Sequence, residues 1–175
     1  NIDAANGFLP AHEPLEALPD EFEIWESMAQ GFSGLLNAGV FRTHAEAMPI
    51  IDDISLLRTS MELERAMLLL SIFGHGFVWQ AYQSSGYVPE SIAVPWTMVA
   101  ERLGRPPTLA HASLILNNWK RLDADGPIKL GNLGTLMQFH GGLDESWFYL
   151  VTTEIEAIGA GILREFERIQ QALPS

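Results

Sequence analysis

The side chains that could bind a metal or move a proton are scattered along this sequence rather than grouped. The histidines stand at positions 12, 44, 75, 111 and 140, without the short spacings that metal ligands share. There are no cysteines, which excludes disulfides, thiolate metal sites, iron–sulfur clusters and a thiol nucleophile. The sequence has no phosphate loop, dinucleotide fingerprint, HExxH motif, nucleophile elbow or paired-carboxylate motif. We therefore predict no metal ligand in this chain, and the motifs alone indicate no catalytic centre.

Two of the histidines have apolar surroundings. His111 is the single titratable residue of a segment whose apolar members are Leu109, Ala112, Leu114, Ile115 and Leu116. Such a segment is either a core element with a hydrogen-bonded histidine or the wall of a small-molecule pocket. Because pockets are few per protein, the residues alone favour the core. His75 stands between two glycines in an apolar helix, which indicates close packing rather than a ligand.

The segment around His111 is predicted to form two short helices within residues 92–123. Pro95 suits the first turn of the first helix, where a missing N–H has no partner to lose. The sequence Gly-Arg-Pro-Pro at 104–107 ends this helix, and its prolines can open the second. An Asn-Asn-Trp-Lys turn at 117–120 should end that second helix.

The residues before this segment are predicted to form an extended arm followed by short helices. Residues 1–19 carry three prolines and no periodic pattern, so they should lie on the domain as an arm. Asp20 is placed to cap a helix that ends near residue 29. Gly31 should interrupt it before a second turn at 32–36, which Gly39 closes. A further helix at 41–48 stops before Pro49.

The longest early helix should be the centre of the domain. Thr59 or Ser60 can cap it, with Glu62 or Glu64 placed to reciprocate. Residues 63–79 are apolar nearly all round, which is typical of a buried helix. Its two glycines at 74 and 76 indicate that other groups pack very close to its backbone.

The last third of the chain is predicted as a long loop followed by one long helix. Residues 122–142 are rich in Gly, Asp and Asn, with a short helix at 133–139 and an exposed His140. A helix over 144–172 follows, and small residues at 157 and 159–161 would let another surface approach it. Its apolar stripe consists of Phe148, Val151, Ile155, Ile158, Ile162, Phe166, Ile169 and Leu173. No strand pattern is visible, so the fold class is predicted to be all-α.

Composition indicates an acidic globular protein. Hydrophobic residues make up 47% of the chain and charged residues 18%, which suits a packed core rather than disorder. The net charge of -12 argues against nucleic acid and anionic membranes as partners. The longest apolar run is shorter than the roughly 20 residues of a membrane span, and no signal peptide is visible. We expect a soluble, cytoplasmic protein whose first residue, because it is not Met, results from processing or trimming.

Several motifs in order resemble one family. They are GFLP at 7–10, LEALPDEFEIWE at 15–26, ELERAMLLLSIFGHGFVW at 62–79, IAVPW at 92–96, LGRPP at 103–107, LNNWK at 116–120 and DESWFYLVTTEIEA at 144–157. At these spacings the chain resembles the indoleamine 2,3-dioxygenases, haem enzymes that open the indole ring of tryptophan. The resemblance covers nearly the whole chain but only the first part of the family's length.

The resemblance implies an all-α organisation in two parts. Residues 1–142 would form the small domain that covers the distal side of the haem pocket, and residues 143–175 the first helix of the large, haem-carrying domain. The cofactor would be haem b. Its axial histidine lies far downstream in the family, so we expect a C-terminal fragment or second chain to supply it.

The resemblance also assigns roles to individual residues. His111, Leu114 and Ile115 fall on pocket-lining positions, and Phe148 on an aromatic that packs against the indole. Thr152 falls where some members carry a serine hydroxyl near dioxygen, and it is the candidate catalytic residue. Phe148, Thr152 and Gly159 are the candidate contacts to the cofactor. Position 111 is often tyrosine in the family, and histidine there leaves the substrate preference open.

The implied activity is insertion of O2 across the indole C2–C3 bond of L-tryptophan or a related indole, giving N-formylkynurenine. Three alternatives stay open. One is a superfamily relative that rearranges a halogenated tryptophan, another is a myoglobin-like oxygen carrier, and the third is a non-catalytic helical interaction domain.

Overall fold

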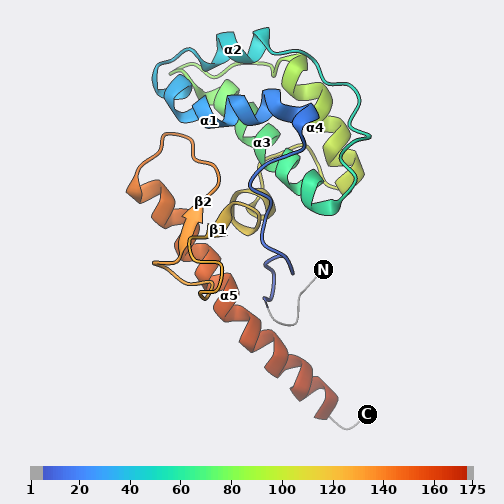
Figure 1. Ribbon diagram of the computed structural model, residues 1–175, viewed down its shortest axis with the longest axis vertical. Coiled ribbons are helices and arrows are strands. Elements are labelled where there is room, and N and C mark those ends of the chain that lie inside the picture. The colour runs from blue at the N-terminus through green and yellow to red at the C-terminus, as the bar shows by residue number, and fades with distance from the viewer. Residues whose placement is uncertain (1–5, 173–175) are drawn as a thin grey trace.

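The computed structural model describes residues 6–172, without the side chains of Arg164 and Glu167. The predicted all-α class is confirmed, since the described chain is mostly helical and has one small two-stranded sheet. The α-helices are α1 (Glu23–Asn37), α2 (Phe41–Ala47), α3 (Ser60–Trp79), α4 (Glu90–Leu103) and α5 (Leu143–Ala172). The short elements are the 3-10 turn η1 (Asp20–Phe22), the π-helical turn η2 (Ala112–Leu116), β1 (Trp119–Arg121) and β2 (Leu133–Thr135). In Figure 1, α1–α4 gather at one end, and α5 runs away from them toward the C-terminus.

Helix α3 is the centre of the main core, as its sequence predicts. It is buried around most of its circumference, and α1, α2 and α4 all pack against it. Its start is fixed by the predicted capping box. The Glu62 N–H donates to the Thr59 hydroxyl over 3.2 Å, and the Thr59 N–H donates to the Glu62 carboxylate over 2.7 Å.

The two glycines of α3 let neighbouring rings approach its backbone, which confirms the predicted close packing. A Cβ atom at Gly74 would overlap the ring of Trp96, and one at Gly76 would lie 2.6 Å from the ring of Phe32. Neither position leaves room for a side chain. The ring of His75 packs against Trp96, and its Nδ1 lies 3.0 Å from the Ser71 carbonyl oxygen.

Three local predictions before residue 104 are wrong. Gly31 does not interrupt α1, because the burial of Trp25 and Phe32 on either side of it outweighs a propensity cost of about 1 kcal/mol. Asp20 does not cap that helix with its side chain. Helix α4 begins at Glu90 rather than near Ile92, so Pro95 lies inside the helix instead of in its first turn.

After residue 104 one prediction is confirmed and one is wrong. The expected second short helix is present as η2, which ends before the predicted turn at 117–120, where the Asn117 side-chain amide donates to the Ala112 carbonyl over 2.9 Å. The expected helix at 133–139 is instead strand β2, which pairs antiparallel with β1. Asn118 supports this ribbon, since its side chain accepts from the Met137 N–H over 2.7 Å and donates to the Met137 carbonyl over 3.0 Å.

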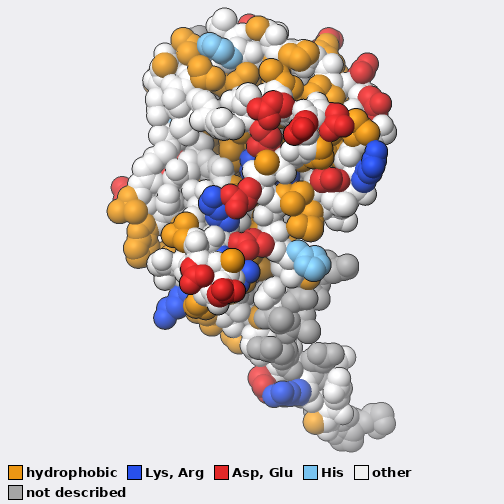
Figure 2. All heavy atoms as spheres, viewed as in Figure 1, with side chains coloured by type: hydrophobic (Ala, Val, Ile, Leu, Met, Phe, Trp, Pro, Cys, Tyr) orange, Lys and Arg blue, Asp and Glu red, His pale blue; other side chains and the backbone are white. Residues whose placement is uncertain are grey.

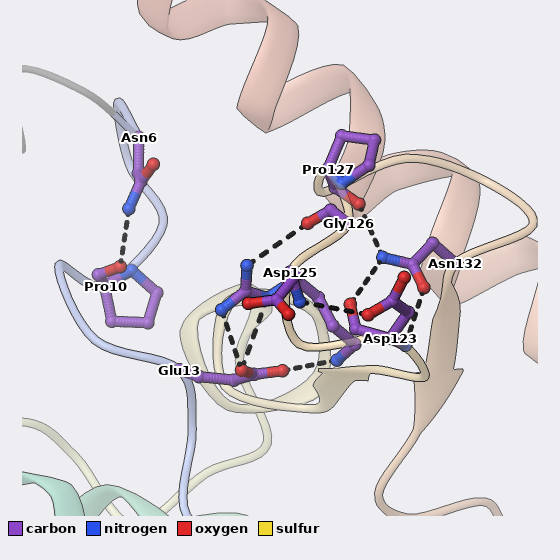
Figure 3. Close-up of polar contacts among 9 residues, drawn as sticks. Asn6, Pro10, Glu13, Asp123, Asp125, Gly126, Pro127 and Asn132 are labelled. Atoms are coloured by element: carbon purple, nitrogen blue, oxygen red, sulfur yellow. Dashed lines mark hydrogen bonds and ion pairs between the residues drawn. The ribbon is translucent and has the colours of Figure 1, made fainter.

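The N-terminal arm is extended, as predicted, and is held against the β1–β2 ribbon. Leu9 is buried in a second small core with Trp119, Leu133 and Leu150. Glu13 accepts hydrogen bonds from the backbone and guanidinium of Arg121. Figure 3 shows Glu13 beside the loop that connects β1 and β2.

Helix α5 packs against η2 and β2 with its first half, and its second half extends away from α1–α4 (Figure 1). No helix among residues 6–172 combines the length and the hydropathy that crossing a membrane requires.

Candidate functional site

Helix α5 is apolar on two opposite sides, and this chain covers only one of them. The covered side packs on η2, the ribbon and the arm through Tyr149, Leu150, Thr153, Ala157 and Ala160. The other side, called here the open face of α5, carries Phe148, Ile155, Ile158, Ile162, Phe166 and Ile169, all exposed. An exposed apolar row of this length marks an interface.

From the apolar stripe of this helix we expect its middle and last turns to be left exposed by the rest of the chain, and the structure confirms this for four of its members. Ile158, Ile162, Phe166 and Ile169 have exposed fractions of 66, 58, 63 and 56%. Leu173, the last member of the predicted stripe, lies outside the described residues.

His111 lies beside α5 and pairs with one of its carboxylates. Its Nε2 is 3.0 Å from Glu156 Oε1, and the histidine side chain is about half exposed. Glu156 follows Phe148 and Thr152 at successive steps of four residues, so the three share one side of the helix. The structure therefore places His111 along the side of α5 that carries Phe148 and Thr152.

The other predicted site residues differ in exposure. Phe148 is 66% exposed. The Thr152 hydroxyl donates to the carbonyl oxygen of Phe148 over 2.9 Å. Gly159 faces open space, because a Cβ there would meet nothing within 4 Å. Leu114, by contrast, packs against the main core, and Ile115 is buried.

Sequence reasoning missed two polar residues that hold α5 in place. Thr153 is buried, and its hydroxyl lies 3.1 Å from the Tyr149 carbonyl and 3.4 Å from the Ile115 carbonyl of η2. Glu145 accepts hydrogen bonds from the N–H groups of Phe139, His140 and Gly141. The sequence indicated only that Glu145 suits the positive end of a helix.

Glu145 also fixes the protonation state of a neighbouring phenol. The Tyr149 hydroxyl donates to Glu145 Oε1 over 2.7 Å. Burial, together with the adjacent carboxylate, raises the pKa of Tyr149 well above its ordinary value of 10.0. Tyr149 is therefore a neutral hydrogen-bond donor near neutral pH.

The described part of the chain contains no group of three or more His, Asp or Glu residues able to hold a metal ion. Most of its histidines have local partners instead. His44 and His75 lie 3.0 Å from backbone carbonyl oxygens, and His140 lies 2.7 Å from the Asn37 side-chain oxygen. The open face of α5 and the helix side next to it thus offer apolar surface, one hydroxyl and one His–Glu pair.

Comparison with known proteins identifies relatives of this chain. A family model described as indoleamine 2,3-dioxygenase matches residues 1–175. The chain is 36% identical over 158 residues to indoleamine 2,3-dioxygenase 2 of Mus musculus, covering 89% of this chain and 38% of that protein. It is 32% identical over 182 residues to indoleamine 2,3-dioxygenase of Saccharomyces cerevisiae, covering 99% and 40%.

A third relative is named for a different substrate. The chain is 28% identical over 165 residues to the 6-hydroxytryptophan 2,3-dioxygenase of Fusarium equiseti, covering 94% of this chain and 41% of that protein. In each case the chain spans about two fifths of the relative's length.

Proposed function

Because this chain belongs to the indoleamine 2,3-dioxygenase family, we propose that it forms the N-terminal part of a haem-dependent dioxygenase. The reaction is insertion of O2 across the C2–C3 bond of the indole ring of L-tryptophan or a related indole, giving N-formylkynurenine, the entry compound of the kynurenine pathway. The observation that carries the proposal is the family match over residues 1–175. The exposed apolar face of α5 supports it, because a catalytic pocket for an indole needs apolar walls.

The open face fits one side of a flat, apolar cofactor. Its exposed Phe148 and Ile155 offer apolar contact, and Gly159 leaves open space beside the helix backbone. Haem b, when bound, supplies the activation of dioxygen. We propose that Phe148, Thr152 and Gly159 lie against it, and that its axial histidine comes from a segment outside these residues, in a C-terminal fragment or second chain.

The residues of this chain orient the substrate and exclude water. The ring of Phe148 can pack against the indole in an offset or edge-to-face arrangement. The Thr152 hydroxyl donates to the Phe148 carbonyl, and its oxygen remains able to accept a further hydrogen bond. His111, held by Glu156, presents a polar ring at the margin of the same side of α5, where it can contact the polar end of an amino acid. Leu114 and Ile115 complete the wall behind it.

The same arrangement supports a proposed domain boundary. Residues 1–142 would form the small domain on the distal side of the haem, and residues 143–175 would supply the first helix of the large domain. The part of the open face of α5 that does not contact the haem is then the surface that the rest of the large domain would cover. The relative that acts on 6-hydroxytryptophan indicates that ring-substituted indoles belong among the substrates to be tested.

The test is a reconstitution. The chain is produced together with the downstream segment of the family, loaded with haem, reduced and given L-tryptophan and O2. We expect N-formylkynurenine, identified by mass and by its ultraviolet absorption. A haem-loaded protein that binds O2 reversibly and leaves tryptophan intact would instead support an oxygen carrier and contradict the proposal. Halogenated and hydroxylated tryptophans, assayed alongside, separate cleavage of the ring from its rearrangement.

A further inference from the structure

A second concave site lies away from the open face of α5. It is a cavity of about 850 Å³ between the N-terminal arm, the first turns of α3 and η2. Its apolar walls include Leu9 and Leu15 of the arm, Met61 of α3 and Leu116 of η2. None of the residues proposed above to contact the haem or the indole lines it. Its volume lies within the range of small-molecule sites, roughly 300–1,000 Å³.

One guanidinium that lines this cavity has a donor without a partner. The side chain of Arg65 is only 4% exposed and pairs with Glu26, to which its Nε donates over 3.0 Å and its Nη2 over 2.6 Å. Its Nη1 is buried and has no hydrogen-bond partner among the described residues. Arg65 is itself one of the residues that line the cavity. A buried donor without a partner costs about 1–3 kcal/mol.

A second guanidinium at the same cavity repeats this pattern. Arg105 Nη2 donates to Glu64 Oε2 over 2.5 Å, and Asn117 contacts the same oxygen over 3.4 Å. The Arg105 Nε is buried and has no partner in the described part of the chain. Arg105, Glu64 and Asn117 all line the cavity. The carboxylates of Glu26 and Glu64 are therefore both hydrogen-bonded, and each guanidinium has one nitrogen donor without a partner among the described residues.

We propose that this cavity binds a small organic carboxylate with an aromatic or aliphatic body. The carboxylate would accept from the unused N–H groups of Arg65 and Arg105, because donors on charged groups form their strongest hydrogen bonds with ionised acceptors. The body of the ligand would lie against the apolar walls. The two ion pairs leave the donors' surroundings neutral, and the chain carries a net charge of -12, so a monoanion fits better than a multiply charged ligand.

The test uses the 175-residue chain and three probes of one shape. These are 3-phenylpropionate, 3-phenylpropionamide and 3-phenylpropanol, with acetate as a carboxylate that lacks the apolar body. Each is titrated by calorimetry and by amide chemical shifts. We expect 3-phenylpropionate to bind at least tenfold more tightly than the amide, the alcohol and acetate, with shift changes at Leu9 and Met61. Equal affinity for all three phenyl probes, or shifts confined to α5, would overturn the proposal.

Matched variants distinguish the role of the Arg105 Nε donor from the role of its positive charge. Arg105→Lys keeps a positive charge beside Glu64 but removes the Nε, and should weaken 3-phenylpropionate binding several-fold while leaving the alcohol unaffected. The control is Arg102→Lys, since Arg102 donates to the Ile54 carbonyl and does not line the cavity. Ala112→Phe adds a ring at the cavity wall and should abolish binding of every probe. If Arg105→Lys and Arg102→Lys behave alike, or Ala112→Phe has no effect, the proposal is wrong. The result is independent of dioxygenase activity, which none of these measurements uses.

Discussion

Thr152 and Thr153 are adjacent in the chain but belong to different sides of α5. The Thr152 hydroxyl bonds only to its own helix at the Phe148 carbonyl. The Thr153 hydroxyl is buried and reaches the Ile115 carbonyl of η2. Substitutions at these two positions should therefore separate substrate handling from stability, which makes them a useful pair beside Phe148.

In the assembled enzyme, Phe148→Ala should weaken indole binding by roughly tenfold or more. The ring is largely exposed in this chain, so its removal costs little folding energy but loses aromatic packing worth about 0.5–1.5 kcal/mol beyond the buried area. Thr152→Ala should have a milder effect, because a hydroxyl orients the substrate and does not ionise. The measurement is substrate affinity from haem absorption changes on titration with tryptophan.

Thr153→Val serves as the contrast and should lower the free energy of unfolding by about 1 kcal/mol. Unchanged affinity in Phe148→Ala would remove this residue from the site.

Gly74→Ala should destabilise the small domain. The added methyl group would overlap the ring of Trp96, and overpacking of a core costs about 1–3 kcal/mol, which exceeds the helix-propensity gain of about 1 kcal/mol. The matched control is Gly34→Ala in α1, where a Cβ meets nothing within 4 Å. That variant should be stabilised by about 0.5–1 kcal/mol. Urea unfolding of the three proteins decides the matter, and the same sign of change in both variants would contradict the packing argument.

Among the elements, the start of α3 makes stability depend on pH. A hydrogen bond from the Thr59 backbone, together with other local bonds, lowers the pKa of Glu62 below its ordinary value of 4.5. The ionised form is therefore favoured by folding, and its contribution is complete above pH 4.5 and is lost as the pH falls through the native pKa. Thr59→Ala should cost about 1 kcal/mol at pH 7.

Glu62→Gln should likewise be less stable than the parent at pH 7, and the difference should shrink below pH 4.5. The control is Glu23→Gln, which removes another first-turn glutamate that bonds only to the Ser27 hydroxyl. Unfolding curves between pH 3 and 7 measure both. A constant difference between Glu62→Gln and the parent across this range would show that the carboxylate does not act through its ionised form.

Elements whose signals are local could be predicted from the sequence. The cap of α3, the end of α2 before Pro49 and the period of α5 depend on residues within a few positions of one another. The ribbon could not be predicted in this way. Strands of three residues are too short to show a period of two, and Met137, just after β2, is held by Asn118 from 19 positions earlier.

The candidate site shows the same division between local and distant signals. The shared side of Phe148 and Thr152 follows from helical spacing alone. The pairing of His111 with Glu156 depends on how η2 packs on α5, and no local pattern encodes that. The cavity between the arm and η2 was not foreseen for the same reason, since its walls come from three separate parts of the chain.

At the level of the whole molecule, the acidic side chains are dispersed, whereas the largest continuous row of exposed apolar side chains lies along α5. Figure 2 shows acidic side chains spread over the helical end that α1–α4 form, with few basic ones among them. The open face of α5 instead carries six exposed hydrophobic side chains in one row. A row of this length favours an apolar interface along α5.

The last prediction concerns haem binding by the 175-residue chain alone. His44, His75 and His140 hold partners in the small domain, and His12 lines the cavity beside the arm. His111 pairs with Glu156 of α5, on the side of the helix that the proposed function assigns to the substrate and dioxygen. We therefore expect weak, heterogeneous haem uptake without a five-coordinate, histidine-ligated spectrum. Absorption spectra during a haem titration measure this, and His111→Ala should leave the weak uptake nearly unchanged. A tight one-to-one complex that cleaves tryptophan without any added polypeptide would show that the axial ligand lies within these residues and that α5 needs no further cover.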